Sequence, residues 1–314
     1  MRDLRIIFMG TPEFAVTTLK KLVENNFNIV GVITAPDKKA GRGRKINESA
    51  IKKYAIDNKL KLLQPKNLKS EDFISNLKAL KANLQIVVAF RMLPKLVWEM
   101  PAYGTFNLHA SLLPDYRGAA PIHWAIINGE KKTGVTTFFI DEKIDTGHII
   151  LQKEITINED EIVGELHDRL MNLGADLVTE TVMKIKNNSV TTQKQKQGSQ
   201  KVAPKLFSDN CKINWNNSID NIYDHIRGLN PFPGAWTDMV NNNDVTSLKI
   251  YKIRKEEYNH KEAIKKIIIT KDNIKVAVNG GYIIIDELKI SGKKKLDSKS
   301  LLNGYSFSMN AIMR

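Results

Sequence analysis

Short apolar runs alternate with segments of helical periodicity over the first half of the chain. Runs at 4–9 (LRIIFM) and 27–34 (FNIVGVIT) predict buried strands, and between them Phe14, Leu19 and Leu22 recur at helical spacing. A strand, a helix and a second strand in this order predict parallel pairing through a right-handed crossover. The pattern continues with predicted helices at 49–58, 70–80 and 94–100 and predicted strands at 60–63 and 84–89. We therefore expect an α/β domain with a Rossmann-like, doubly wound, mostly parallel sheet.

The stretch 104–118 (GTFNLHASLLPDYRG) begins with the period of a strand and ends as an irregular loop. Apolar and polar residues alternate from Thr105 to His109, so the side chains of Asn107 and His109 point the same way. A polar pair at the end of a strand, followed by a loop, is typical of a site of chemistry in α/β proteins. The alternative is an edge strand whose polar face meets solvent.

The pattern changes in the second half of the chain. Predicted strands at 133–140 and 148–152 flank the acidic turn 141–147, and a helix follows at 162–185. Residues 187–200 have almost no apolar side chains and indicate a linker. Beyond it, the sequence predicts a helix at 218–229 and β-rich segments at 245–258, 263–270, 274–278 and 281–290. We expect an α/β domain at 1–187, a linker at 188–204, and a second, mostly β domain that forms a small barrel at 205–314.

The length and charge of the chain limit the kinds of protein that it can be. A chain of 314 residues can form two domains of ordinary size, and a formal net charge of +14 favours a polyanionic partner such as nucleic acid. A general preference for lysine in the genome is the alternative explanation of the charge. The one cysteine, Cys211, excludes an intrachain disulfide and a cysteine-based zinc site. No apolar run is long enough for a signal peptide or a membrane span, and we expect a cytoplasmic protein.

The segment 36–48 (PDKKAGRGRKINE) has glycines, basic residues and no apolar periodicity. These features predict an exposed, mobile loop. Its cations could reach an RNA phosphate backbone, and a solvated surface loop is the alternative. The candidate RNA-contacting residues are Lys38, Lys39, Arg42, Arg44 and Lys45.

Asn107, His109 and Asp145 form the candidate catalytic group. Asp145 lies in the turn between two predicted strands, and a carboxylate there would orient the imidazole of His109 and favour its protonated form. Asn107 and His109 could then each donate a hydrogen bond to a carbonyl oxygen that becomes an oxyanion. No serine or cysteine nearby is marked as an activated nucleophile, so the group fits acyl transfer to an external nucleophile. A metal site is the alternative, but two ligands are too few to predict one.

Several longer motifs carry a family resemblance. The run FNLHASLLPDYRGAAPIHWAIINGEKKTGVT at 106–136, followed by IDTG at 144–147, resembles the folate-dependent formyltransferases. The branch of that family that acts on methionyl-tRNA is the most similar. Its resemblance extends over nearly the full length, through IIFMGTPEFA at 6–15, APDKKAGRGRK at 35–45, APKLFSDNCKINW at 203–215 and IRGLNPFPGAW at 226–236.

The resemblance implies a reaction and a set of roles. The formyl group of 10-formyltetrahydrofolate would pass to the α-amine of methionine on initiator tRNA. Asn107 and His109 would stabilise the oxyanion, and Asp145 would set the ionisation of His109 and assist proton transfer. The loop around Arg42 would meet the acceptor end of the tRNA, and the OB-like barrel would hold its backbone. The residues implied to line the folate site are Ser111, Leu112, Leu113 and Pro114.

Two other functions stay open on the sequence. One is a formyltransferase for a small amine, such as glycinamide ribonucleotide or a nucleotide-linked amino sugar. The other is an RNA-binding protein that kept the fold and lost catalysis, although the intact Asn107, His109 and Asp145 argue against it. We expect a monomer, no metal and no membrane partner.

Overall fold

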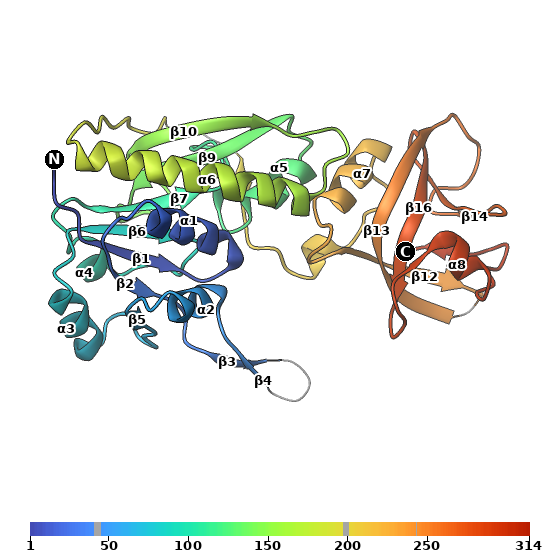
Figure 1. The fold of residues 1–314 in the computed structure, drawn as a ribbon. Coiled ribbons are helices and arrows are strands. Elements are labelled where there is room, and N and C mark those ends of the chain that lie inside the picture. Colours follow the sequence, from blue (N-terminus) through green and yellow to red (C-terminus); the bar gives the residue numbers. More distant parts are fainter. Residues whose placement is uncertain (41–44, 197–200, 243) are drawn as a thin grey trace. The chain divides into compact units, whose positions relative to one another are not determined.

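The structure is a computed structural model that describes residues 1–40, 45–196, 201–242 and 244–314. The chain forms two compact units. The first contains residues 1–118, 134–155 and 167–202, and the second contains residues 119–133, 156–166 and 203–314. Figure 1 shows the α/β character of the first unit and the mostly β character of the second.

A seven-stranded sheet forms the centre of the first unit, in the order β10-β9-β7-β6-β1-β2-β5. β1 pairs in parallel with β2 and β6, β2 with β5, and β6 with β7, whereas β7 and β9 are antiparallel. The predicted Rossmann-like, mostly parallel sheet is therefore confirmed. Its strands are β1 (Ile6–Gly10), β2 (Ile29–Ile33), β5 (Leu62–Leu63), β6 (Leu84–Val88), β7 (Thr105–His109), β9 (Lys132–Phe139) and β10 (Ile149–Thr156). Its helices are α1 (Glu13–Glu24), α2 (Ala50–Asp57), α3 (Glu71–Ala79), α4 (Lys95–Trp98) and α6 (Val163–Lys186).

Helices cover the two faces of this sheet and decide which way β7 points its side chains. Val87 of β6 packs in one core cluster with Phe73 of α3 and Val97 of α4. On the other face, Leu108 of β7 lies so close to Gly174 of α6 that a methyl group on the glycine would come within 2.7 Å of a leucine methyl. Since neighbouring residues of a strand alternate, Asn107 and His109 point away from α6.

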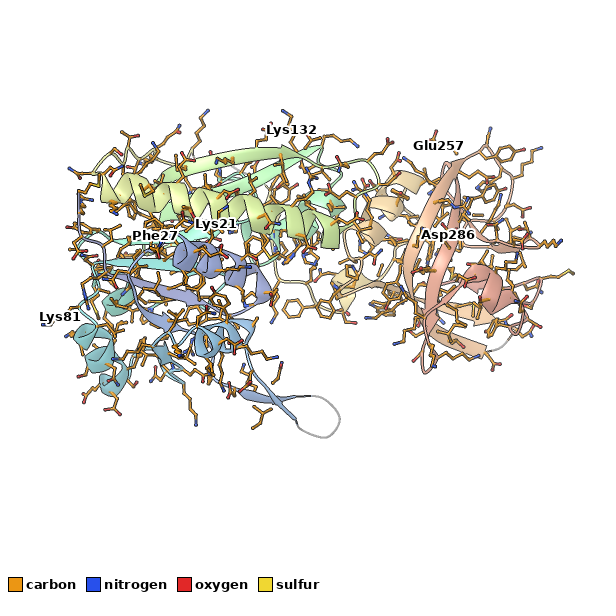
Figure 2. The ribbon with its side chains drawn as sticks, in the orientation of Figure 1. Lys21, Phe27, Lys81, Lys132, Glu257 and Asp286 are labelled. Carbon is orange, nitrogen blue, oxygen red and sulfur yellow. The ribbon has the colours of Figure 1, made fainter. Side chains whose placement is uncertain are left out.

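Helix α1 lies beside α6 on the same side of the sheet (Figure 1). Lys21, labelled in Figure 2, forms an ion pair with Asp176 of α6. The apolar positions predicted for this helix include Phe14, Leu19 and Leu22, and all three are buried. The helical period of the sequence thus identified the face of α1 that packs on the sheet.

The basic segment 36–48 differs from the prediction. It contains two short antiparallel strands, β3 (Lys38–Ala40) and β4 (Lys45–Asn47), so the prediction of a loop was wrong for these residues. A two-stranded ribbon is held by backbone hydrogen bonds and needs no alternation of apolar residues when it buries neither face. Arg42 and Arg44 lie outside the described residues.

The second unit is built on an antiparallel sheet in the order β14-β15-β16-β13-β12-β18. A bridge between Lys266 and Ile312 links the β14 and β18 ends, which closes the sheet into a barrel. Trp215 is buried in the core and its indole donates to Thr237 Oγ1 at 2.9 Å. The predicted mostly β barrel is confirmed, with strands that the pattern missed at β12 and β18.

The strands of the barrel are β12 (Ala235–Asn241), β13 (Asp244–Glu257), β14 (Ile267–Ile269), β15 (Ile274–Val278), β16 (Gly281–Ile290), β17 (Leu296–Asp297) and β18 (Ile312–Met313). Figure 2 labels Glu257 at the end of β13 and Asp286 on β16. The other elements are β8 (Arg117–Gly118), α5 (Pro121–Ile127), β11 (Val202–Ala203), a 3₁₀ turn at Asp209–Cys211, α7 (Ile219–Arg227) and α8 (Ser298–Leu302).

Helix α7 packs against the barrel core through Ile219, Ile222 and Ile226. It begins with Ser218, whose hydroxyl accepts from the backbone N–H of Asn221 and caps the first turn. Among the helices that the structure describes, none is long and apolar enough to cross a membrane.

Candidate functional site

The side chain of Asn107 ends in an amide that no described residue uses. It lies on β7 between β6 and β9, opposite Val87 on one side and Phe138 on the other. Its side chain is half-buried. Within the described part of the chain, no group forms a hydrogen bond with its carboxamide. A buried amide would normally be paired, so this partly open amide is available to a ligand.

His109 is held by one of its two ring nitrogens. The side chain is buried, and Nε2 lies 2.8 Å from the carbonyl oxygen of Tyr116. Because a carbonyl can only accept, Nε2 carries a hydrogen in this arrangement. Nδ1 is then the nitrogen that can gain or lose a proton, and it lies 3.9 Å from Asp145 Oδ2.

Asp145 belongs to the turn 140–148 between β9 and β10, 36 residues after His109 in the sequence. Its carboxylate oxygen Oδ2 accepts from the backbone N–H of Gly118 at 3.0 Å. Its backbone is in the left-handed region with φ of 55°, a conformation that few residues other than glycine adopt. The structure thus brings His109 and Asp145 together, and it places Asn107 on the same side of β7 as His109.

Hydrogen bonds within the Asp145 turn also stabilise it. The carboxylate of Asp141 accepts from Thr146 Oγ1 at 2.7 Å and from the backbone N–H of Lys143 at 3.1 Å. At Gly147, a Cβ atom would lie 1.7 Å from the carbonyl oxygen of Phe139. Glycine is therefore required there, because any side chain would push the turn away from β9.

The loop 111–114 follows β7 directly. Ser111 is fully buried and its hydroxyl donates to the carbonyl of Asp115 at 2.6 Å. Thr136 Oγ1 donates to the carbonyl of Ser111 at 2.6 Å and accepts from the N–H of Leu113 at 3.2 Å. Leu113 is buried, whereas Leu112 and Pro114 are half-buried. Ser111 and Leu113 thus fix the shape of the loop, and the other two leave part of their surface open.

Sequence reasoning missed Gln195, which lies in the segment predicted as a linker. It is buried, and its amide donates to the carbonyls of Asp145 at 2.9 Å and Gly147 at 2.8 Å. Its oxygen accepts from Arg117 Nε at 3.1 Å. Nothing in the run NNSVTTQKQKQGSQ distinguishes this glutamine from its neighbours.

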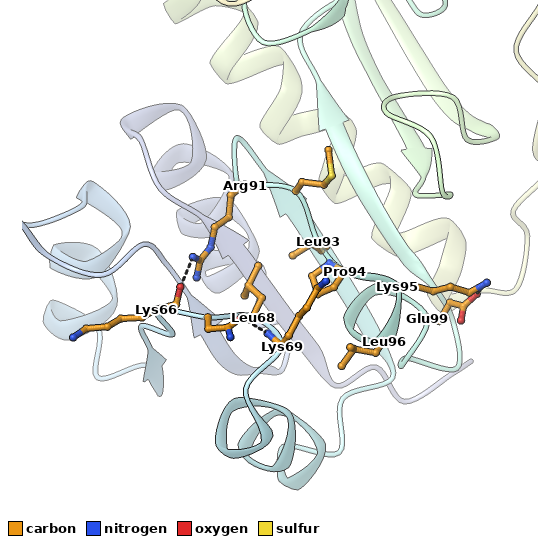
Figure 3. Close-up of a pocket in the computed structure, with 11 residues that line it drawn as sticks. Lys66, Leu68, Lys69, Arg91, Leu93, Pro94, Lys95, Leu96 and Glu99 are labelled. Atoms are coloured by element: carbon orange, nitrogen blue, oxygen red, sulfur yellow. Dashed lines mark hydrogen bonds and ion pairs between the residues drawn. The ribbon is translucent and has the colours of Figure 1, made fainter.

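A cavity of about 830 Å³ opens at the same edge of the sheet (Figure 3). One wall is formed by residues that follow β6, the strand that pairs in parallel with β7. The guanidinium of Arg91 donates to the carbonyls of Pro65 and Lys66, and partial burial lowers the pKa of Arg91. The lining residues are Lys66, Asn67, Leu68, Lys69, Arg91, Met92, Leu93, Pro94, Lys95, Leu96 and Glu99.

One contact joins this cavity to the Asp145 turn. Lys95 Nζ donates to Glu142 Oε1 at 2.9 Å, and it lies 3.4 Å from Glu99 Oε1. This pairing raises the pKa of Lys95 and lowers that of Glu142. A ligand in the cavity would therefore lie next to a loop that carries a candidate catalytic carboxylate.

The predicted RNA-contacting residues are described only in part. Lys38 is exposed on β3. Lys39 and Lys45 lie on β3 and β4, and Arg42 and Arg44 fall between the two strands, outside the described residues. Among the described residues, no three or more histidine, cysteine, aspartate or glutamate side chains form a group that could hold a metal ion.

Comparison with known proteins identifies the family of this chain. The family described as formyl transferase matches residues 4–182, and its C-terminal domain matches residues 205–306. The chain is 57% identical to the methionyl-tRNA formyltransferase of Flavobacterium johnsoniae over 312 residues, which is 99% of both proteins. It is 49% identical to the methionyl-tRNA formyltransferase of Bacteroides fragilis over 320 residues, again 99% of both.

A solved structure gives an independent view of the fold. The sugar 3N-formyl transferase WlaRD, studied in the presence of dTDP and 5-N-formyl-THF, matches with a TM-score of 0.66 and 22% identity. The match covers 94% of this chain and 100% of that one. At this identity the likeness establishes a shared architecture.

Proposed function

Because the chain belongs to the methionyl-tRNA formyltransferase family, we propose that it transfers the formyl group of 10-formyltetrahydrofolate to the α-amine of methionine on initiator tRNA. The N-formylmethionyl-tRNA that results serves translation initiation. The cluster of Asn107, His109 and Asp145 is the active site. The observation that carries this assignment is the unpaired Asn107 carboxamide beside a His109–Asp145 pair with 3.9 Å between its nearest atoms.

In the reaction, the amine nitrogen attacks the formyl carbon and the carbonyl oxygen becomes an oxyanion. Asn107 donates its amide hydrogen to that oxygen, which requires no rearrangement because the amide has no other partner among the described residues. One preorganised donor of this kind contributes about 2.7–4 kcal/mol to stabilising the transition state. Collapse of the adduct breaks the bond between the formyl carbon and the folate nitrogen, and that nitrogen takes up a proton.

His109 and Asp145 handle charge and protons. With Nε2–H committed to Tyr116, a protonated His109 presents Nδ1–H, which is the second donor to the oxyanion. Asp145 lies next to this nitrogen and balances its positive charge. The incoming amine loses a proton as the new bond forms, and Asp145 assists that transfer, directly or through a water molecule.

The formyl donor occupies the cavity beside α4 and the loop 111–114. A folate is a flat ring system with a carboxylate-bearing tail. The cavity combines an apolar wall that includes Leu68 and Leu96 with lysines at 66 and 69, and its volume is typical of a small-molecule site. Leu112 and Pro114 supply half-buried apolar surface near the formyl group. This supports a donor ring near β7 with its tail toward the lysines.

The tRNA is bound through basic residues. The basic segment 36–48, which includes Lys38, Lys39, Arg42, Arg44 and Lys45, meets the acceptor end, and the barrel domain at 205–314 holds the backbone. The net charge of +14 supports a polyanionic substrate. Binding of this kind weakens as salt rises, because each phosphate contact releases counterions.

The test compares acceptors with one donor. Formyl transfer from 10-formyltetrahydrofolate is measured to methionyl initiator tRNA, to elongator methionyl-tRNA, to uncharged initiator tRNA and to glycinamide ribonucleotide. We expect efficient formylation of the first and none of the uncharged tRNA, which has no amine to accept the group. A preference for the small amine would replace this function with the small-molecule alternative. Binding of tRNA without formyl transfer would indicate an RNA-binding protein.

A further inference from the structure

We propose that Gln195, in the segment that joins the two units, is a positioning residue that holds the Asp145 turn in its catalytic geometry. The inference rests on the proposed function, because it assigns to Gln195 an effect on a reaction that Asp145 assists. Gln195 itself touches no reacting atom. Its role is to fix the backbone from which the Asp145 carboxylate projects.

Both ends of the Gln195 amide have hydrogen-bond partners. Both amide hydrogens go to the turn, one to the carbonyl of Asp145 at 2.9 Å and one to the carbonyl of Gly147 at 2.8 Å. The amide oxygen accepts from Arg117 through Nε at 3.1 Å and Nη2 at 2.5 Å. Since arginine only donates and carbonyls only accept, the orientation of the amide is fully determined.

The burial of Gln195 stands out within its segment. Its exposed fraction is 6%, while its neighbours Lys194 and Lys196 are exposed. A polar side chain is taken out of water at such a position only when its hydrogen bonds are satisfied, as they are here. The segment therefore does more than connect the units, since it places one amide into the wall of the active site.

The Asp145 turn needs such a clamp. Asp145 has a φ of 55°, which is unfavourable for a residue with a side chain. Such a backbone conformation is kept only where surrounding contacts hold it in place. Gln195 holds the carbonyls on both sides of Thr146. Without these two bonds the turn can relax, and the carboxylate moves away from His109.

Three consecutive residues, 116–118, complete the arrangement. The first accepts from His109 through its carbonyl, the second donates from its side chain to Gln195, and the third donates its N–H to the Asp145 carboxylate. The same three-residue stretch thus fixes the histidine directly and the aspartate at two points, its carboxylate and, through Gln195, its backbone. Small shifts of such groups have large effects on rate.

The experiment replaces the glutamine without changing its length. Gln195→Met removes both donors and the acceptor, and Gln195→Glu keeps the bonds to Arg117 but cannot donate to the carbonyls while ionised. We expect either change to lower kcat of tRNA formylation by about tenfold to a hundredfold, with KM for both substrates within about twofold of wild type. The matched control is Gln193→Met, because Gln193 pairs with Ile149 through its backbone and its side chain is exposed.

A double-mutant cycle separates positioning from general loss of structure. Asp145→Asn removes the charge, keeps the shape, and places at this φ a residue that tolerates it. If Gln195 acts through Asp145, then adding Gln195→Met to the Asp145→Asn variant should lower kcat by less than about twofold. A full multiplicative loss in that background would overturn the inference, as would a wild-type kcat for the two Gln195 variants. A wild-type kcat for Asp145→Asn would instead overturn the role of Asp145 in the proposed function.

Discussion

Replacing Asn107 by alanine tests whether its carboxamide stabilises the oxyanion. The Asn107 carboxamide has no partner among the described residues, so truncation leaves no buried group unsatisfied. Its half-buried position also limits the apolar contacts that are lost. The variant should therefore fold with nearly wild-type stability, and its defect should be confined to catalysis.

The expected size of the defect follows from one lost donor. A single preorganised hydrogen bond to a developing oxyanion is worth about 2.7–4 kcal/mol, which corresponds to a fall in kcat of roughly a hundredfold to a thousandfold. Asn107→Asp should be at least as defective, because an ionised carboxylate has the shape of the amide but can only accept, and it repels the oxyanion.

The assay is single-turnover formylation of methionyl initiator tRNA, with thermal unfolding measured on the same samples. Asn172→Ala is a suitable control, since Asn172 lies exposed on α6 and bonds within its own helix through Asp168. We expect the control to react at the wild-type rate. A rate for Asn107→Ala within threefold of wild type would refute the assignment of Asn107.

Three further changes have defined outcomes. Gly147→Ala should lower kcat strongly, because its Cβ would lie 1.7 Å from the carbonyl of Phe139 and displace the Asp145 turn, and formylation kinetics check this. Arg227→Met should destabilise the second unit by about 3–5 kcal/mol in chemical denaturation, because it leaves Asp224 without the guanidinium that Arg227 Nε holds 2.7 Å away. Burial lowers the pKa of His225 below its usual value of 6.5. Below about pH 6.5 the histidine therefore binds a proton more readily in the unfolded chain than in the folded chain. Stability should accordingly fall between about pH 7 and 5.5 in thermal melts of wild type, and less steeply in His225→Gln.

The helices and strands, and the positions of Asn107 and His109, were predictable because apolar and polar residues repeat there with a regular period. Alternation along 105–109 placed Asn107 and His109 on one side of a strand, and the order of strands and helices gave a parallel sheet. The position of Asp145 in a turn between two strands then made its approach to this strand a natural expectation. The distance of 3.9 Å to His109 is a property of the fold that the sequence pattern could not supply.

Other features leave no such trace. Gln195 is one of several glutamines in a polar run, and its burial depends on the path that this run takes across the Asp145 turn. The β3–β4 ribbon has no apolar run to mark it, since its two strands have the sequences KKA and KIN. Strand β18 has two residues, too few to show any period, although it closes the barrel.

The central claim is that this chain formylates methionyl-tRNA with His109 in the reaction centre. Its most direct test is a single-turnover measurement of formyl transfer from 10-formyltetrahydrofolate to methionyl initiator tRNA by wild type and His109→Ala, with tRNA affinity measured in parallel. We expect efficient transfer by wild type, a rate at least a hundredfold lower for the variant, and equal tRNA binding. Transfer by His109→Ala at the wild-type rate would contradict it.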